Sequence, residues 1–208
     1  MYVAADCSDF DDVYPALGRL VLSSSYLEGR LRYLVGWLAA TDEASIVFDG
    51  QSTDWLIQSA KAMLGELKQT GAYALQDCGR FEAALARAKE LNNDRNFFVH
   101  GEWSIESGDD LCIPRPKSRP IDERVFYIAR SRLRKVFQEH EVAVVDVELL
   151  AGQMFELGRE ITAAVDEGHR LRFAWEALHP PTVIESHDDI DVLLEALQRK
   201  ARRQGGHP

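Results

Sequence analysis

The sequence predicts a mainly α-helical fold, an antiparallel helical bundle with a small β-hairpin or meander inserted after the third helix. Apolar residues recur at spacings of three and four along four long stretches of the chain, which is the pattern of amphipathic helices. Between the third and fourth stretches apolar and polar residues alternate, as in half-buried strands. With 208 residues, the chain is long enough for one well-packed domain with an elaboration. We therefore expect a helical domain over residues 1–180, with the β insertion at about 102–130.

The first predicted helix spans roughly residues 12–40. Acidic residues between Asp9 and Asp12 supply candidates for its N-terminal cap. Its apolar face comprises Leu17, Leu20, Val21, Leu27, Leu31, Leu34, Val35 and Leu38. A polar strip runs beside this face, and within it Glu28 and Arg32 lie four residues apart, which allows them to pair.

Turn residues separate the next two predicted helices. After a loop over residues 48–52, the second helix begins at Ser52 or Thr53 and ends before Gly71, with an apolar stripe that starts at Trp55. A break at about 77–79 precedes the third helix, whose apolar stripe comprises Phe81, Ala84, Leu85, Ala88, Leu91 and Phe98. Arg95 continues this stripe, and a guanidinium that faces a core or an interface needs a partner.

The sequence pattern changes its period at Trp103. Apolar and polar residues alternate from there, residues 107–110 are typical of a turn, and residues 111–113 can return as a second strand. Residues 124–130 are rich in Val, Phe, Tyr and Ile, and we predict a third strand there. The apolar spacing that continues to Phe137 also fits a helix.

The last long helix is predicted to begin at Asp146, which suits an N-cap, and to end before Pro180. Its apolar stripe comprises Leu149, Leu150, Met154, Leu157, Ile161, Ala164, Val165, Leu171 and Leu178. Residues 181–208 are then expected to form a linker and a short C-terminal amphipathic helix, which packs on its own domain or on a second copy.

The charge balance bears on the class of partner. The formal net charge of −10 counts against a nucleic acid held mainly by its phosphates, because such affinity comes from Lys and Arg. A local basic run can still bind a nucleic acid despite the negative net charge. Arg115, Lys117 and Arg119 are weak candidates for such RNA contacts. The alternative reading of this run is a solvated face.

Cysteine use and missing motifs narrow the classes further. Cys7, Cys78 and Cys112 are far apart and odd in number, which indicates neither a disulfide framework nor a paired-cysteine zinc site and fits a reducing cytoplasm. Neither a secretory signal nor an apolar run of membrane-spanning length is present, so we expect a soluble cytoplasmic protein without membrane contacts. Dinucleotide-binding, phosphate-loop and zinc-protease motifs are absent, and we expect neither a cofactor nor a metal.

The most unusual stretch lies between Leu91 and Trp103, where polar side chains end an apolar helical pattern. Asn96 and His100 are four residues apart and share one face of the helix, with Arg95 about a quarter turn away, so the three side chains can converge. We expect Gly101 just past the helix end, where a left-handed conformation is common. His100 would then lie in the last turn, which favours its protonated form. Alternatively, Arg95 and His100 only bond to the last helical carbonyls and a nearby carboxylate.

Arg95, Asn96 and His100, followed by Gly101, resemble the signature of HEPN domains: an Arg, usually a polar residue, and a His after a short gap. The resemblance covers this motif and, more loosely, the helices on either side of it. It implies a HEPN-like all-α bundle that is frequently dimeric. Many members are metal-independent ribonucleases of toxin–antitoxin, antiviral and RNA-processing systems, and others only bind partners. An antitoxin or another protein would then be a partner.

The resemblance also implies roles for the motif residues. In an active dimer, two copies would line a cleft with their Arg95 and His100 side chains. His100 would move protons at the reacting oxygens of RNA, and Arg95 would stabilise the charge on the phosphoryl group. Asn96 would bind phosphate or orient His100, and Glu28 would orient Arg95 if its strip faced the third helix.

Two other functions remain open at this point. A non-catalytic helical protein that dimerises or binds a partner explains the acidic balance better. An accessory protein could instead bind RNA through residues 115–134 without cutting it.

Overall fold

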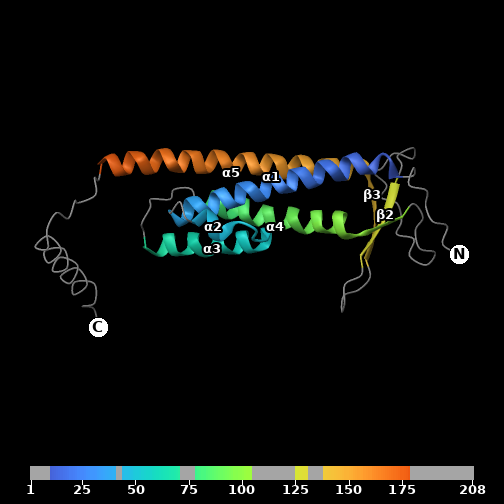
Figure 1. Ribbon diagram of the computed structural model, residues 1–208, viewed down its shortest axis with the longest axis horizontal. Helices are drawn as coiled ribbons and strands as arrows, with labels where there is room; N and C mark the ends of the chain where they lie inside the picture. The colour runs from blue at the N-terminus through green and yellow to red at the C-terminus, as the bar shows by residue number, and fades with distance from the viewer. Residues whose placement is uncertain (1–9, 41–43, 71–77, 105–124, 131–137, 179–208) are drawn as a thin grey trace, which may run out of the picture. The chain divides into compact units, whose positions relative to one another are not determined.

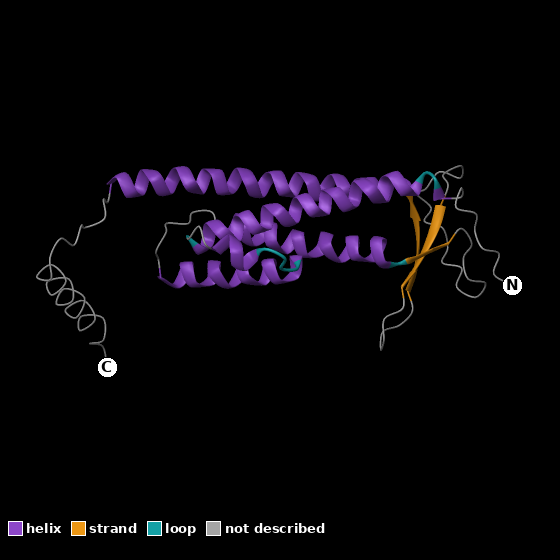
Figure 2. Ribbon diagram, in the orientation of Figure 1, coloured by secondary structure: helices purple, strands orange, loops and turns teal. Residues whose placement is uncertain are grey.

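The structure, a computed structural model, describes residues 10–40, 44–70, 78–104, 125–130 and 138–178. It is mainly α-helical with a small antiparallel sheet, as predicted (Figures 1 and 2). The helices of the described part are α1 (Val13–Ala39), α2 (Ala44–Phe48), α3 (Thr53–Thr70), α4 (Cys78–His100) and α5 (Val144–Leu178). The strands are β1 (Glu102–Ser104), β2 (Val125–Arg130) and β3 (Gln138–Ala143).

The predicted bounds of the long helices are close to those observed. The first helix was expected over 12–40 and spans Val13–Ala39. The second was expected from Ser52 or Thr53 to before Gly71 and spans Thr53–Thr70. A short helix, α2, occupies residues 44–48, which the sequence pattern did not predict. It is too short to show a helical period, so apolar spacing could not reveal it.

Helix α4 runs antiparallel to the helices beside it. Trp37 near the end of α1 contacts Phe81 near the start of α4, with ring centroids 5.4 Å apart. In contrast, α1 and α5 run in the same direction, because Arg19 pairs with Glu148 early in both helices and Tyr33 bonds to Asp166 further along both (Figure 1). The antiparallel arrangement therefore holds for α4 and its neighbours, whereas α1 and α5 are parallel.

The main core lies where the apolar stripes of the four long helices meet. Its fully buried side chains include Leu27 and Leu31 of α1, Leu64 of α3, Phe81 of α4 and Leu157 of α5. Burial of each such side chain contributes about 1.5–3 kcal/mol relative to exposure. Four residues expected in the stripes are exposed instead: Val21, Trp55, Leu149 and Leu171. The apolar stripes predicted from the sequence therefore include residues beyond the helix faces that pack into the core.

The sheet has the order β1-β2-β3, and both pairings are antiparallel. The predicted strand at 124–130 is confirmed as β2, in which Ile128 lies opposite Trp103 of β1 and His140 of β3. Strand β3 was not predicted, and the expected strand at 111–113 lies outside the described residues. Phe126 and Ile128 form a second, small core with Val13 at the start of α1.

The start of α5 differs from the prediction. Asp146 was expected to be the N-cap, but the helix begins at Val144. The Asp146 carboxylate instead reaches back and accepts a hydrogen bond from the Ala143 backbone N–H at 2.7 Å. A carboxylate in the third helical position commonly binds the N-cap N–H in this way. Asp146 therefore indicated correctly that a helix starts in this region, but the helix begins two residues before it, at Val144.

The chain divides into two compact units, residues 1–166 and 167–208. The boundary that the sequence predicts near residue 180 stays a prediction, because residues 179–208 lie outside the described part of the chain. The predicted linker and amphipathic helix at 181–208 lie outside the described residues, as do Arg115, Lys117 and Arg119. Of the helices described, none combines the length and apolar character that crossing a membrane requires.

Candidate functional site at the end of α4

The polar motif occupies the last turns of α4, and His100 is the last residue of the helix, as predicted. Gly101 follows it directly, but its role differs from the prediction, because Gly50 is the glycine with a positive φ among the described residues. A Cβ atom on Gly101 would lie 2.2 Å from Ile128 Cγ2 and 2.7 Å from the Phe97 carbonyl oxygen. Gly101 is therefore required for the close approach of β2 to the helix end.

Trp103 binds one of the backbone carbonyls that have no partner within the helix at the end of α4. Its indole Nε1–H donates to the Phe98 carbonyl oxygen at 2.9 Å. The last carbonyls of a helix have no partner within the helix, so an indole in this position stabilises the end. Arg95 and His100 bond to side chains instead, which argues against the reading in which they only serve the last carbonyls.

Arg95, Asn96 and His100 converge as the helical spacing predicted. Arg95 Nη1 donates to Asn96 Oδ1 at 2.9 Å and lies 3.4 Å from His100 Nε2. A guanidinium has no acceptor, so this contact is a hydrogen bond only when His100 Nε2 carries a lone pair and the ring proton is on Nδ1. His100 is exposed, and Arg95 and Asn96 are half-buried. The exposed imidazole of His100 thus lies beside a fixed positive charge.

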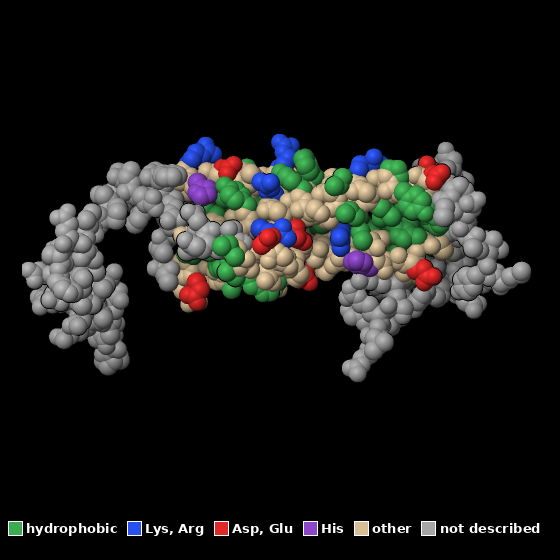
Figure 3. Space-filling model, viewed as in Figure 1, with side chains coloured by type: hydrophobic (Ala, Val, Ile, Leu, Met, Phe, Trp, Pro, Cys, Tyr) green, Lys and Arg blue, Asp and Glu red, His purple; other side chains and the backbone are tan. Residues whose placement is uncertain are grey.

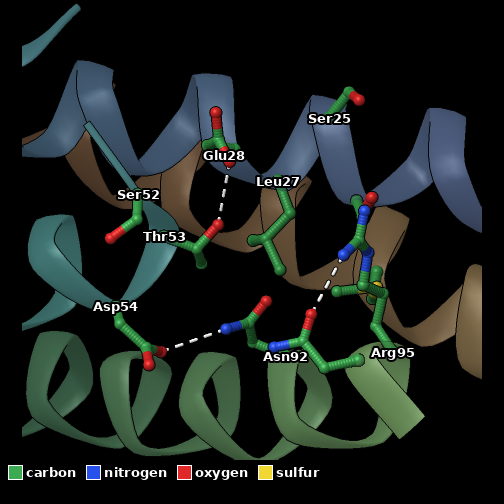
Figure 4. Close-up of a pocket in the computed structure, with 11 residues that line it drawn as sticks. Ser25, Leu27, Glu28, Ser52, Thr53, Asp54, Asn92 and Arg95 are labelled. Carbon is green, nitrogen blue, oxygen red and sulfur yellow. Dashed lines mark hydrogen bonds between the residues drawn. The ribbon is translucent and has the colours of Figure 1, made fainter. Parts of the chain in front are cut away.

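A pocket of about 270 Å³ adjoins Arg95 on the side of α1 and α3. Ser24 and Glu28 of α1, Thr53 and Asp54 at the start of α3, and Asn92 of α4 contribute polar atoms to its lining. Figure 4 shows Leu27 projecting between the helices, and Met154 of α5 adds a second apolar group. The pocket is therefore polar at its walls and apolar on part of its surface.

The pocket wall formed by α3 and α4 is held by a buried amide. Asn92 is only 7% exposed, and its Nδ2 donates to Asp54 Oδ1 at 3.0 Å (Figure 4). Lys89 Nζ lies 2.8 Å from Asp54 Oδ2. The hydrogen bond from Lys89 lowers the pKa of the Asp54 carboxyl against the opposing effect of partial burial, and the charge of Lys89 and the Asn92 amide lower it further.

Glu28 faces the same pocket as Arg95, so the polar strip of α1 does lie toward α4. Its two carboxylate oxygens bind other residues, however. Oε1 pairs with Arg32, as the spacing predicted, and Oε2 accepts a hydrogen bond from the Thr53 hydroxyl at 2.9 Å. The hydrogen bond from Thr53 thus joins the start of α3 to α1, whereas the Arg32 pair lies within α1. Arg95 Nε is buried and has no hydrogen-bond partner within the described residues.

The sequence did not single out Thr53, Asp54 or Asn92 as site residues. One signal for Asn92 was available, since it lies four residues before Asn96 and occupies a buried position on the same face. The contribution of α3 had no comparable signal, because it depends on how α3 packs against α1 and α4.

Charge on the visible face of the molecule is mixed. Figure 3 shows Lys and Arg side chains interspersed with Asp and Glu, without a continuous basic patch over the described residues. Extended contact with a phosphate backbone requires such a patch. On this face, an anionic ligand would be held by few cations.

The arrangement suits chemistry at a phosphoryl or carbonyl centre. It combines a planar donor group in Arg95, an accessible imidazole in His100 and an amide in Asn96. Within the described residues, His, Cys, Asp and Glu do not gather in threes where a metal ion could be held. No protein-family model matches the sequence, and no curated protein or solved structure is significantly similar to it.

Proposed function

We propose that the protein is a metal-independent endoribonuclease of HEPN type that uses Arg95, Asn96 and His100. The observation that supports this most directly is the 3.4 Å contact between Arg95 Nη1 and the exposed ring of His100. It brings a proton acceptor and a phosphate-binding fork to one accessible point at the end of α4. Both groups accelerate cleavage of a phosphodiester by a neighbouring hydroxyl.

In this reaction the 2′-hydroxyl of RNA attacks the adjacent phosphorus atom. The Arg95 guanidinium turns from His100 Nε2 to the phosphate, which frees the Nε2 lone pair. His100 Nε2 then takes the hydroxyl proton, the new 2′-oxygen to phosphorus bond forms, and the bond to the 5′-oxygen of the next nucleotide breaks. The departing 5′-oxygen takes a proton, from the protonated imidazole or from water. The products are a 2′,3′-cyclic phosphate and a 5′-hydroxyl. Arg95 stabilises the negative charge that builds on the other phosphoryl oxygens, with Asn96 as a second donor.

We place the reaction in a homodimer, in which the exposed ends of two α4 helices face one cleft. A second copy would supply another His100, so that one imidazole accepts a proton while the other donates one. This division of roles also explains how a single site carries out acid and base steps together.

The chemistry is tested with one oligonucleotide prepared as RNA, as its 2′-O-methyl derivative and as DNA, each incubated in EDTA. We expect only the RNA to be cut, with 2′,3′-cyclic phosphate ends, because the other two lack the attacking hydroxyl. Cutting of the DNA, or an activity that EDTA removes, would contradict the proposal.

A non-catalytic protein that dimerises or binds a partner is the second candidate. Exposed apolar side chains on α1 and α5 favour it, since Leu22, Leu149 and Phe155 are 72%, 61% and 44% exposed. Exposed apolar groups of this size suit a protein interface. Sedimentation of the wild type beside Leu22→Glu would test it, and the expected result is a loss of self-association in the variant. In that case RNA would remain intact with either protein.

A further inference from the structure

The pocket beside Arg95 presents mainly hydrogen-bond acceptors. The hydroxyls of Ser24 and Ser25 both donate to the Val21 carbonyl oxygen, at 2.8 and 3.0 Å. The Thr53 hydroxyl proton is directed to Glu28, at 2.9 Å. The protons of these three hydroxyls are already donated to acceptors of the protein. Toward a ligand, the hydroxyl oxygens can therefore act only as acceptors, through their lone pairs.

The amide and carboxylate groups of the pocket add to this bias. Asn92 directs its Nδ2 toward Asp54, which leaves its Oδ1 as an acceptor. Glu28 and Asp54 are acceptors in their ionised forms, and the cations Arg32 and Lys89 compensate their charge. The interior is therefore rich in acceptors without carrying a large uncompensated charge, which suits a neutral ligand that bears N–H groups.

Donors are fewer. Ser52 Oγ accepts a hydrogen bond from the Trp55 backbone N–H at 3.3 Å, so the Ser52 hydroxyl proton is one of them. The others lie at one end of the pocket, where the Arg95 guanidinium is part of the lining. Asn96 accepts from Arg95 Nη1 through its Oδ1, so its NH₂ group stays available as a donor. An oxygen of the ligand, or a phosphate attached to it, would bind at this end (Figure 4). The carboxylates disfavour a phosphate deeper in the pocket.

The size of the pocket limits the ligand further. A volume of about 270 Å³ lies just below the usual range of small-molecule sites, about 300–1,000 Å³, which suits a single base rather than a dinucleotide. Leu27 and Met154 close the pocket on its apolar side, and each is only 1% exposed, so the polar groups of the lining rather than apolar contact define the ligand.

We infer that this pocket binds one RNA base that carries an exocyclic amino group, and that the enzyme therefore prefers to cut beside adenine, cytosine or guanine rather than uracil. The amino group donates to the acceptors of the interior, and the phosphate lies at Arg95. Uracil presents two carbonyl oxygens and one ring N–H, which match an acceptor-rich pocket poorly. This inference rests on the ribonuclease activity proposed above.

Binding is tested first, with the full chain in EDTA and with AMP, CMP, GMP and UMP as probes in isothermal titration calorimetry. We expect the three amino-bearing nucleotides to bind about ten-fold more tightly than UMP, the discrimination of one good pair of hydrogen bonds. Equal affinity for all four would overturn the inference.

Two substitutions at Ser24 connect this binding to the pocket. Ser24→Leu fills space in the lining, and it should weaken AMP binding at least ten-fold. Ser24→Ala keeps the volume and removes one acceptor, so it should weaken binding about three- to ten-fold. Both replacements favour the helix, which protects the fold of α1. Ser23→Leu, one residue away and outside the lining, is the matched control and should leave AMP affinity unchanged. Unchanged AMP affinity in Ser24→Ala and Ser24→Leu would also overturn the inference.

Cleavage is tested second, by mapping the cut positions in an RNA that contains all four bases in every neighbouring order. Cuts should be enriched beside amino-bearing bases in the wild type and in Ser23→Leu, and evenly distributed in Ser24→Leu. Even cutting by the wild type would overturn the inference and leave the ribonuclease proposal intact. Nucleotide binding without RNA cleavage would instead contradict the ribonuclease proposal, and the pocket would then be a site for free nucleotides.

Discussion

Arg95 connects the two halves of the candidate site. Its Nη1 faces Asn96 and His100, whereas its Nε lies buried on the same guanidinium without a partner within the described residues. A planar guanidinium can bind in both directions at once, which a lysine ammonium on a flexible stem cannot reproduce. Shape as well as charge should therefore matter at this position.

Replacing Arg95 by Lys tests this requirement. We expect kcat/KM for RNA to fall about 10²–10³-fold, close to the loss in Arg95→Ala, because the charge remains but the directed donors are lost. The matched control is Arg87→Lys on the same helix, where the side chain makes an exposed pair with Glu160 at 3.3 Å. Activity that survives in Arg95→Lys would mean that charge alone suffices.

Asp54 gives the site a predicted pH dependence. The hydrogen bond from Lys89 holds the pKa of the Asp54 carboxyl below its usual value. A group whose pKa is lowered on folding stabilises the fold above its unfolded pKa of about 3.9, and this contribution is lost as the pH falls through the folded value. Asp54 and Lys89 are partly exposed, so the effect should be about 1 kcal/mol or less.

Thermal melts of the wild type and of Asp54→Asn between about pH 7 and about pH 3 measure this contribution. The variant should melt at a lower temperature near neutral pH, and the difference should shrink below about pH 4. Asp11→Asn, at an exposed position on the N-terminal side of α1, should match the wild type throughout. A difference that persists at the acid end would show that the Asp54 charge is not its source.

At the scale of elements, the junction between α4 and β2 fixes the position of His100. Gly101 approaches Ile128 so closely that a methyl group there would overlap it. We expect Gly101→Ala to lower stability by about 1–3 kcal/mol, as overpacking does, and to lower RNA cleavage further than the stability loss explains. Gly79→Ala, at the start of α4 where a Cβ has open space, should lower neither, because alanine favours the helix. Chemical denaturation and cleavage assays on both variants provide the comparison.

The elements also show which features of this chain were predictable. Long helices appear in the sequence because each repeats its apolar spacing many times, and the convergence of Arg95, Asn96 and His100 follows from spacing within one helix. Helix α2 is too short to repeat an apolar spacing, and strand β3 begins with four polar residues, Gln138 to Glu141, so both were missed. The pocket was missed because Thr53 and Asn92 are brought together by packing between helices, and no local pattern records that packing.

At the scale of the whole molecule, the acidic balance predicts how the proposed RNA substrate would be held. With a net charge of −10 and mixed charge on the visible face, we expect few phosphate contacts. The affinity of His100→Ala for single-stranded RNA should then fall with salt at a logarithmic slope of about −1 to −2, since each phosphate contributes about −0.7. Fluorescence anisotropy measures this slope. A much steeper slope would assign RNA binding to the basic run at residues 115–134.

The central claim is that the imidazole at the end of α4 carries out RNA cleavage without a metal. Its most direct test is the initial rate of RNA cleavage in EDTA by the wild type, His100→Ala and His169→Ala, with thermal melts on the same samples. We predict a loss of about 10²–10⁴-fold in His100→Ala, full activity in His169→Ala, and unchanged melting of His100→Ala. Equal rates in all three proteins, or unfolding of His100→Ala, would contradict the catalytic role.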